Sequence, residues 1–316
     1  MTDKCKEKRK LLRLNQNGKI EVVAKRWAIL QNEKANVVTF SPDGRFLATR
    51  SGDQTVRIWR VKDNNLVAEL TGHDKLITDV AFSADSQFVA VASLSETVRI
   101  WNILNKELVM ELPAGHGSQV SSVAFSPNGQ FIVTGSEDNT ARIWRFGSGK
   151  LISELTEHRG WVISAAFSPD NSLVATGAGA GDKTARIWDV RSGVLVKELT
   201  GCNYSSVDIA FSPDGRFVAT AAGDAAWIWD IESGKMVKEL GGHSDWVTSI
   251  AFSPDGQFIA TGSADKAALI WRVQDWAKVT EITGHNHRVN SVAFSPDGHL
   301  LATASYDNTV QLWEIS

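Results

Sequence analysis

A short phrase, Phe-Ser-Pro-Asp-Gly or a close variant, occurs seven times along this chain and constrains its fold more than any other feature. The phrase recurs at intervals of 41 to 44 residues, and a tryptophan follows each copy 18 to 21 residues later. The phenylalanines are Phe40, Phe82, Phe125, Phe167, Phe211, Phe252 and Phe294. A period in the low forties with four short strand-like runs in each unit is the signature of a β-propeller.

Each unit is predicted to form four antiparallel strands. In the sixth unit, residues 246–252 alternate as a strand, and Ser-Pro-Asp-Gly at 253–256 supplies the turn residues that proline and glycine favour. Two further strands are expected at 257–262 and 267–271, and a more polar outer strand at 278–282. The apolar inner strands must be covered on both faces, which stacked neighbours in a ring achieve. The predicted fold class is therefore all-β, a seven-bladed propeller with four antiparallel strands per blade.

The two ends of the chain predict how the ring closes. The last unit ends after its third strand, at 310–313, while residues 19–28 form a strand candidate that precedes the first unit. We expect this N-terminal strand to complete the last blade. The propeller domain is then residues 19–316, preceded by a basic, flexible tail at residues 1–18.

Composition indicates a globular protein of the cytoplasm. Hydrophobic residues make up 43% of the chain, and no apolar run approaches the roughly 18 residues that span a bilayer. The N-terminal residues contain no apolar segment of the kind found in secretion signals. Cys5 and Cys202 lie in different contexts and form neither a disulfide framework nor a metal set, which favours a reducing compartment.

The charge distribution separates the tail from the body. Net charge is −3, with about +4 in residues 1–13 and so about −7 in the rest. An acidic body argues against nucleic acid as a partner of the propeller, because phosphate binding needs a positive field. The basic tail is either a solvated leader or a contact for nucleic acid or anionic lipid.

These units resemble the WD40 family over about 95% of the chain. A Gly-His pair precedes the phrase in four units, and the Trp-Asp dipeptide stands at 188–189 and 229–230. The pairs are Gly72-His73, Gly115-His116, Gly242-His243 and Gly284-His285. The resemblance implies a non-catalytic interaction protein that needs no cofactor and no metal.

The resemblance also implies a buried hydrogen-bonded chain of His, Ser or Thr, Asp and Trp in each blade. Burial requires that every polar group of such a chain has a partner. The full set occurs in four units, as His116-Thr134-Asp138-Trp144, His158-Thr176-Asp182-Trp188, His243-Thr261-Asp265-Trp271 and His285-Thr303-Asp307-Trp313. A hydrolase triad is the rival interpretation, but no active site needs four copies of a nucleophile, so no catalytic residue is predicted.

Three units depart from this pattern. The first has Gln31 where His is expected, and the fifth has Cys202 there. The second keeps His73 but has Val91 in place of Thr and Ser95 in place of Asp. A half-satisfied network is weaker than a complete one, so we expect faster amide exchange in these three blades.

In WD40 proteins, partners most often engage one narrow end of the propeller, its top face. The family positions that supply contacts fall here on Lys34, Leu76, Leu94, Gln119, Glu137, Trp161, Ile163, Trp246, Arg288 and Tyr306. Trp161 and Trp246 are additional to the blade tryptophans, and with the other apolar members they would form an aromatic cup. The alternative is that these side chains fold inward over their own blades.

The predicted function is a non-catalytic protein–protein interaction scaffold that binds a protein or peptide on the top face. The alternative is a sensor or autoinhibitory domain of a larger signalling protein. An enzyme working in the central channel is disfavoured, because the predicted mouth is apolar and small. Outer strands that carry Lys-Glu pairs guard against edge-to-edge association, so a monomer is expected, with no membrane partner.

Overall fold

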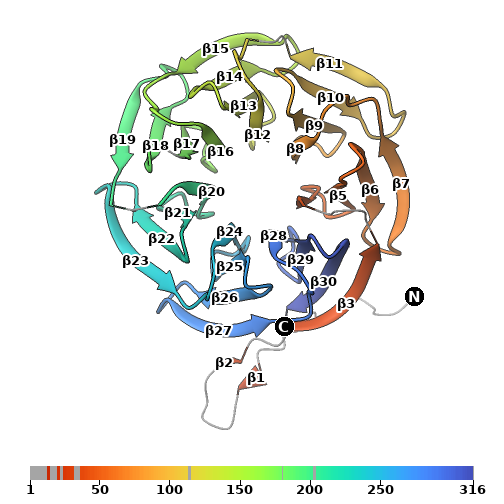
Figure 1. The fold of residues 1–316 in the computed structure, drawn as a ribbon, viewed down its shortest axis with the longest axis vertical. Helices are drawn as coiled ribbons and strands as arrows, with labels where there is room; N and C mark the ends of the chain where they lie inside the picture. Colours follow the sequence, from red (N-terminus) through yellow and green to blue (C-terminus); the bar gives the residue numbers. More distant parts are fainter. Residues whose placement is uncertain are drawn as a thin grey trace, which may run out of the picture.

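The computed structural model describes residues 13–14, 20–21, 24–31, 36–112, 115–179, 181–201 and 204–315. Within these ranges every regular element is a β-strand, and seven antiparallel four-stranded sheets stand around a central axis (Figure 1). The predicted all-β, seven-bladed propeller is confirmed.

Each blade uses four strands, the first lying innermost and the fourth outermost (Figure 1). Blades one to three comprise β4 (Val38–Phe40), β5 (Phe46–Arg50), β6 (Val56–Arg60) and β7 (Asn65–Leu70); β8 (Ile77–Phe82), β9 (Phe88–Ser93), β10 (Val98–Asn102) and β11 (Leu108–Leu112); and β12 (Val120–Phe125), β13 (Phe131–Ser136), β14 (Ala141–Arg145) and β15 (Lys150–Leu155).

Blades four to six continue the same order. They comprise β16 (Val162–Phe167), β17 (Leu173–Ala178), β18 (Ala185–Asp189) and β19 (Leu195–Leu199); β20 (Ser206–Phe211), β21 (Phe217–Ala222), β22 (Ala225–Asp230) and β23 (Lys235–Gly241); and β24 (Val247–Phe252), β25 (Phe258–Ser263), β26 (Ala268–Arg272) and β27 (Ala277–Ile282).

The seventh blade joins the two ends of the chain. Its strands β28 (Val289–Phe294), β29 (Leu300–Ser305) and β30 (Thr309–Ile315) are completed by β3 (Ala24–Gln31), which pairs antiparallel with β30 (Figure 1). The predicted closure is confirmed, but the strand lies at 24–31 and not at 19–28. Leu30 explains the difference, because it is 4% exposed and belongs to the apolar cluster between the seventh and first blades.

The repeated phrase forms the turn between the first and second strands. In the sixth blade, the Ser253 hydroxyl donates to Asp255 Oδ1 at 2.7 Å and accepts from the backbone NH of Phe258 at 2.9 Å. The same carboxylate oxygen accepts from the NH of Gln257 at 3.0 Å. Gly256 has a φ of 68°, in the left-handed region that favours glycine. The Ser, Asp and Gly of the phrase thus each have a role in this turn.

The core is divided among the spaces between neighbouring blades. Ile58 and Leu70 of the first blade belong to the same buried cluster as Ile77 and Val89 of the second, and all four are at most 1% exposed. Burying a side chain of this size contributes about 1.5 to 3 kcal/mol. Each blade therefore depends on both neighbours.

Strand direction sorts the connections onto two faces. The link from the second to the third strand and the link from one blade to the next lie on one face, here called the top face. The second-to-third link is longer in the fourth blade, between Ala178 and Ala185, than in the third, between Ser136 and Ala141. Outside the ring, β1 (Arg13–Leu14) pairs with β2 (Ile20–Glu21).

Removing β3 should destabilise the ring more than removing what precedes it. We expect deletion of residues 1–31 to lower the melting temperature by on the order of 10 °C, since about 2 to 4 °C corresponds to each kcal/mol in chains of roughly this size. Deletion of residues 1–23 leaves β3 and serves as the control. Differential scanning calorimetry of both forms is the measurement, and equal melting temperatures would contradict the closure account.

Candidate functional site on the top face

A hydrogen-bonded chain of side chains supports the top face of the sixth blade. His243 Nδ1 lies 2.8 Å from Asp265 Oδ2, and His243 Nε2 lies 2.8 Å from Thr261 Oγ1. The Trp271 indole NH donates to the same hydroxyl oxygen at 3.1 Å. The carboxylate also accepts from the backbone NH of Ser244 at 3.1 Å. A carboxylate only accepts, so His243 donates from Nδ1 and accepts the threonine proton at Nε2.

Three other blades contain the same chain. The distances from His Nδ1 to Asp, from His Nε2 to Thr and from Trp to Thr run from 2.7 to 3.0 Å. These sets are centred on His116, His158 and His285. Each of these Thr residues is at most 1% exposed, and its hydroxyl is engaged by both the His and the Trp, so it is not available as a nucleophile.

The protonation states follow from burial and hydrogen bonding. Burial lowers the pKa of His158 to about 4, even though its hydrogen bond to Asp182 opposes that shift. Burial disfavours ionisation of Asp182, but hydrogen bonds from Thr184, the Arg159 backbone and Arg186 hold its pKa well below its ordinary value. The chain thus pairs a neutral imidazole with a carboxylate at neutral pH.

The second blade lacks this chain. Val91 and Ser95 take the places of Thr and Asp, and neither His73 Nε2 nor the Trp101 indole NH has a hydrogen-bond partner within the described part of the chain. The first and fifth blades keep the Trp-Thr bond, at 2.9 and 3.1 Å. The Gln31 side chain and Cys202 lie outside the described residues.

Exchanging Thr and Val between two blades should have opposite effects on stability. Thr261→Val leaves His243 Nε2 and the Trp271 indole NH without a partner, and we expect a cost of about 1 to 3 kcal/mol. Val91→Thr supplies the missing hydroxyl to His73 and Trp101, and we expect a gain of about 1 kcal/mol. Urea denaturation measures both, and destabilisation by both substitutions would contradict the account of the networks.

The predicted top-face residues divide by exposure. Trp161 is 51%, Trp246 60% and Leu76 38% exposed. The half-buried members are Leu94, Gln119, Glu137, Ile163, Arg288 and Tyr306. Lys34 lies outside the described residues.

Three of the half-buried residues pack within their own blades. The Arg288 guanidinium carbon lies 4.1 Å from the centre of the Tyr306 ring. Ile163 lies so close to Gly179 that a Cβ there would be 2.5 Å from its Cδ1. These three side chains therefore contact residues of their own blades, whereas Trp161 and Trp246 are exposed.

A third exposed aromatic residue, Tyr204, was not predicted as a contact residue from the sequence. Tyr204 is 48% exposed, and its ring covers Gly223. Each of the three lies just before the start of the first strand of its blade. Trp161 and Trp246 immediately precede the first strands of blades four and six, and Tyr204 lies two residues before the first strand of blade five. We call these three residues the aromatic arc. Tyr204 lies one residue before the position at which WD40 proteins usually contact partners in that blade. Its aromatic residue type was the only feature of the sequence that could have identified it.

Two carboxylates on the innermost strands were also missed. Asp79 Oδ2 accepts from the backbone NH of Val123 at 2.9 Å, and Asp208 Oδ2 accepts from that of Ile250 at 2.9 Å, so each ties its blade to the next. Ser249 makes the corresponding bond to Val292 at 3.1 Å. Burial raises the pKa of both carboxyl groups. The pKa of Asp79 rises to about 6, and the negative charge of Asp208 makes a smaller contribution to this rise.

The raised pKa of Asp79 predicts a pH-dependent effect of Asp79→Asn. A carboxyl that binds its proton more tightly in the folded state adds stability below the unfolded pKa of about 3.8, and this stability is lost as pH rises through about 6. The free energy of unfolding of the variant, relative to wild type, should therefore rise by on the order of 2 kcal/mol between pH 4 and pH 7.5.

Urea titrations at several pH values measure this difference. Asp214→Asn is the matched control, because the pKa of Asp214 is lowered. Burial alone would raise this pKa, but hydrogen bonds from Ser212 and Arg216 outweigh burial. Because that pKa lies below 3.8, the relative stability of Asp214→Asn should change only slightly between pH 4 and pH 7.5, and in the opposite direction. A flat difference for Asp79→Asn would contradict the assignment.

A ring of seven blades, each of the first six ending in an outer strand and linked to the next by a top-face connection, defines a repeat protein of the β-propeller class. The family model "WD domain, G-beta repeat" matches residues 31–60, 64–102, 106–145, 149–189, 193–230, 234–272 and 276–314. The chain belongs to the WD40 family.

One curated relative is similar over a single short segment. It is the general transcriptional corepressor TUP1 of Saccharomyces cerevisiae, 47% identical over 38 residues. The match covers 12% of this chain and 5% of the relative.

Two features are absent from the described residues. They contain no helix with the length and apolar character to cross a membrane. They also contain no group of three or more His, Cys, Asp or Glu side chains placed to hold a metal ion.

Proposed function

We propose that this protein is a non-catalytic scaffold that binds a protein or peptide on its top face, with the aromatic arc as the main contact. The observation that carries the proposal is the exposure of three aromatic side chains on three successive blades, 51%, 48% and 60% for Trp161, Tyr204 and Trp246. Tryptophan and tyrosine are the residues that most often dominate binding energy at protein interfaces.

The backbone around the arc favours binding without large ordering costs. Trp161 and Trp246 immediately precede strands, and their carbonyl oxygens accept hydrogen bonds from Gly179 at 2.7 Å and Ala264 at 2.8 Å. The backbone of each tryptophan is therefore fixed to the second-to-third link of its own blade. A fixed backbone loses little conformational entropy on binding.

The remaining features of the proposal follow from residue chemistry. The threonines of the His networks are engaged, which supports a function without catalysis. The acidic body supports a protein partner in preference to nucleic acid. We further propose a monomer in the cytoplasm. The role named for the yeast relative is not transferred, because the similarity covers only 38 residues.

The experiment compares three baits in a quantitative capture from native lysate. They are the wild type, Trp161→Ala/Trp246→Ala, and the control Leu104→Ala/Val194→Ala, whose side chains are 80% and 61% exposed but lie in third-to-fourth strand links on the opposite face. We expect the tryptophan variant to lose partner binding by at least about 30-fold, as for two interface hot spots. Melting temperatures should be equal. Equal capture by all three baits, or capture by none, would contradict the proposal.

A further inference from the structure

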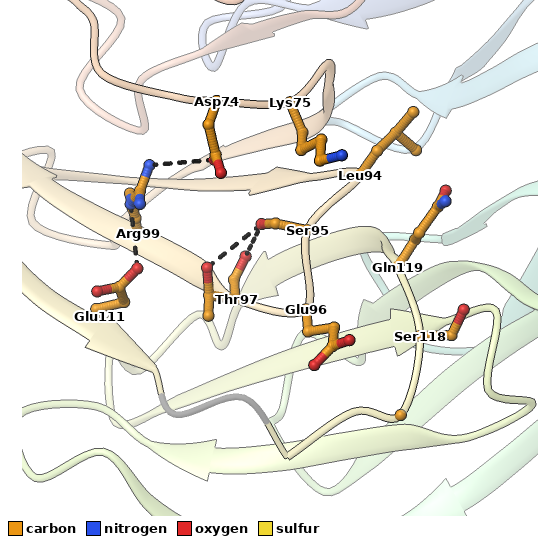
Figure 2. A pocket seen from close by; sticks show the side chains of 11 residues that line it. Asp74, Lys75, Leu94, Ser95, Glu96, Thr97, Arg99, Glu111, Ser118 and Gln119 are labelled. Carbon is orange, nitrogen blue, oxygen red and sulfur yellow. Dashed lines mark hydrogen bonds and ion pairs between the residues drawn. The ribbon is translucent and has the colours of Figure 1, made fainter.

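A pocket of about 610 Å³ opens on the top face between the second and third blades (Figure 2). The second blade contributes its entry link, with Asp74 and Lys75, its 94–97 turn, and Arg99 on β10. The third blade contributes residues 117–119. Leu94 and Gln119, two of the predicted contact residues, line it.

The third blade shows what normally lies at this point of a blade. There, Asp138 Oδ2 lies 3.0 Å from His116 Nδ1, accepts from the Gly117 backbone NH at 3.0 Å, and lies 3.5 Å from Arg142 Nη1. The fourth blade repeats this arrangement around Asp182. A carboxylate is thus held by an imidazole, a backbone NH and a guanidinium.

The second blade keeps the donors but not the carboxylate. His73, the Asp74 backbone NH and Arg99 occupy the positions of His116, Gly117 and Arg142, while Ser95 replaces the aspartate. Ser95 Oγ lies 2.7 Å from Ser93 Oγ and 3.3 Å from Thr97, so it turns back into its own loop (Figure 2).

The retained donors are incompletely matched. His73 is 6% exposed, and its Nε2, the nitrogen that meets threonine in the complete blades, has no hydrogen-bond partner among the described residues. Its Nδ1 is the nitrogen that meets the carboxylate in those blades. Arg99 Nη1 donates to the Gly72 carbonyl at 2.7 Å, and Arg99 Nε pairs with Glu111 at 3.1 Å. The Asp74 carboxylate lies 3.9 Å from Arg99 with 71% of its side chain exposed, which is a loose contact.

The charges around the pocket limit what can enter. Lys75 and Arg99 are cationic, whereas Asp74, Glu96 and Glu111 are anionic. The lining therefore carries a net charge of −1, and Arg99 is already paired with Glu111. In the third blade, however, Arg142 is likewise paired with Glu154 and still lies 3.5 Å from the Asp138 carboxylate, so such a pair can hold one further carboxylate. A phosphate dianion would meet stronger repulsion from Asp74 and Glu96.

We propose that this pocket receives the side-chain carboxylate of an Asp or Glu residue of the bound partner, in the place that Asp138 and Asp182 fill in the next two blades. This inference rests on the proposed function, because it gives the chemistry of the partner on the same face. The incoming carboxylate accepts hydrogen bonds from His73 Nδ1, the Asp74 NH and Arg99. These bonds are strengthened because the acceptor is charged and the pocket is less polar than water.

Small probes test carboxylate binding without a partner. We would titrate N-acetyl-aspartate N-methylamide and N-acetyl-glutamate N-methylamide into the ¹⁵N-labelled full chain and follow the Asp74 amide and the His73 ring by NMR. A saturable shift of the Asp74 amide is expected, together with a rise in the pKa of His73, which burial and then Arg99 lower to about 4 in the free protein. N-acetyl-asparagine N-methylamide, which lacks the charge, should not bind.

Variants locate the site. Ser95→Asp supplies the chain's own carboxylate and should abolish probe binding, while the matched variant Ser95→Asn should retain it. Lys75→Gln and Arg99→Gln should each weaken binding by about tenfold, the usual loss for a hydrogen bond to a charged group. Because Lys75 is exposed, its replacement also guards against an effect of misfolding.

Each outcome decides the proposal. No saturable binding, or equal binding by wild type and Ser95→Asp, would overturn it. Binding of N-acetyl-alanine in preference to the two side-chain probes would overturn the side-chain source in favour of a chain terminus. These results leave the role of the aromatic arc standing, since that is measured with the tryptophan variants.

Discussion

Packing between neighbouring blades is the interaction on which the rest of this structure depends. Each four-stranded sheet has two apolar faces, and each face is buried only against the next sheet, as Ile58 is against Ile77. A row of such sheets would leave a face uncovered at each end, and closing the ring removes both. The pairing of β3 with β30 performs this closure, and the Leu30 side chain seals the boundary between the first and last blades.

The same closure positions the functional surface. Because every innermost strand is fixed by its neighbours, the short links at its top end have little freedom. Bonds such as Asp79 to Val123 and Asp208 to Ile250 add a second set of ties between blades around the channel. In four blades the buried His chain then fixes the entry link to the second-to-third turn. These contacts hold in place the links that carry the aromatic arc and the pocket beside Arg99.

Much of this could be predicted from the sequence, because the information is repeated. The phrase around Phe252 recurs with its turn chemistry, and the four complete His sets align at fixed spacing, so both follow from local pattern. The bounds of β3 did not follow, since that strand has no phrase of its own and its register is set by the burial of Leu30 between blades distant in sequence. Tyr204 and Asp79 were missed because their exposure and neighbours exist only once the ring has formed.

The central claim is that partners bind across the aromatic arc on the top face, and site-specific photo-crosslinking tests it most directly. The photoreactive residue p-benzoylphenylalanine would be placed at Trp246 in one form of the protein and at Val194, on the opposite face, in another. Both side chains are at least 60% exposed, so access to solvent is matched. The account predicts a cross-linked partner from position 246 and none from position 194. The reverse result, or equal cross-linking from both positions, would contradict it.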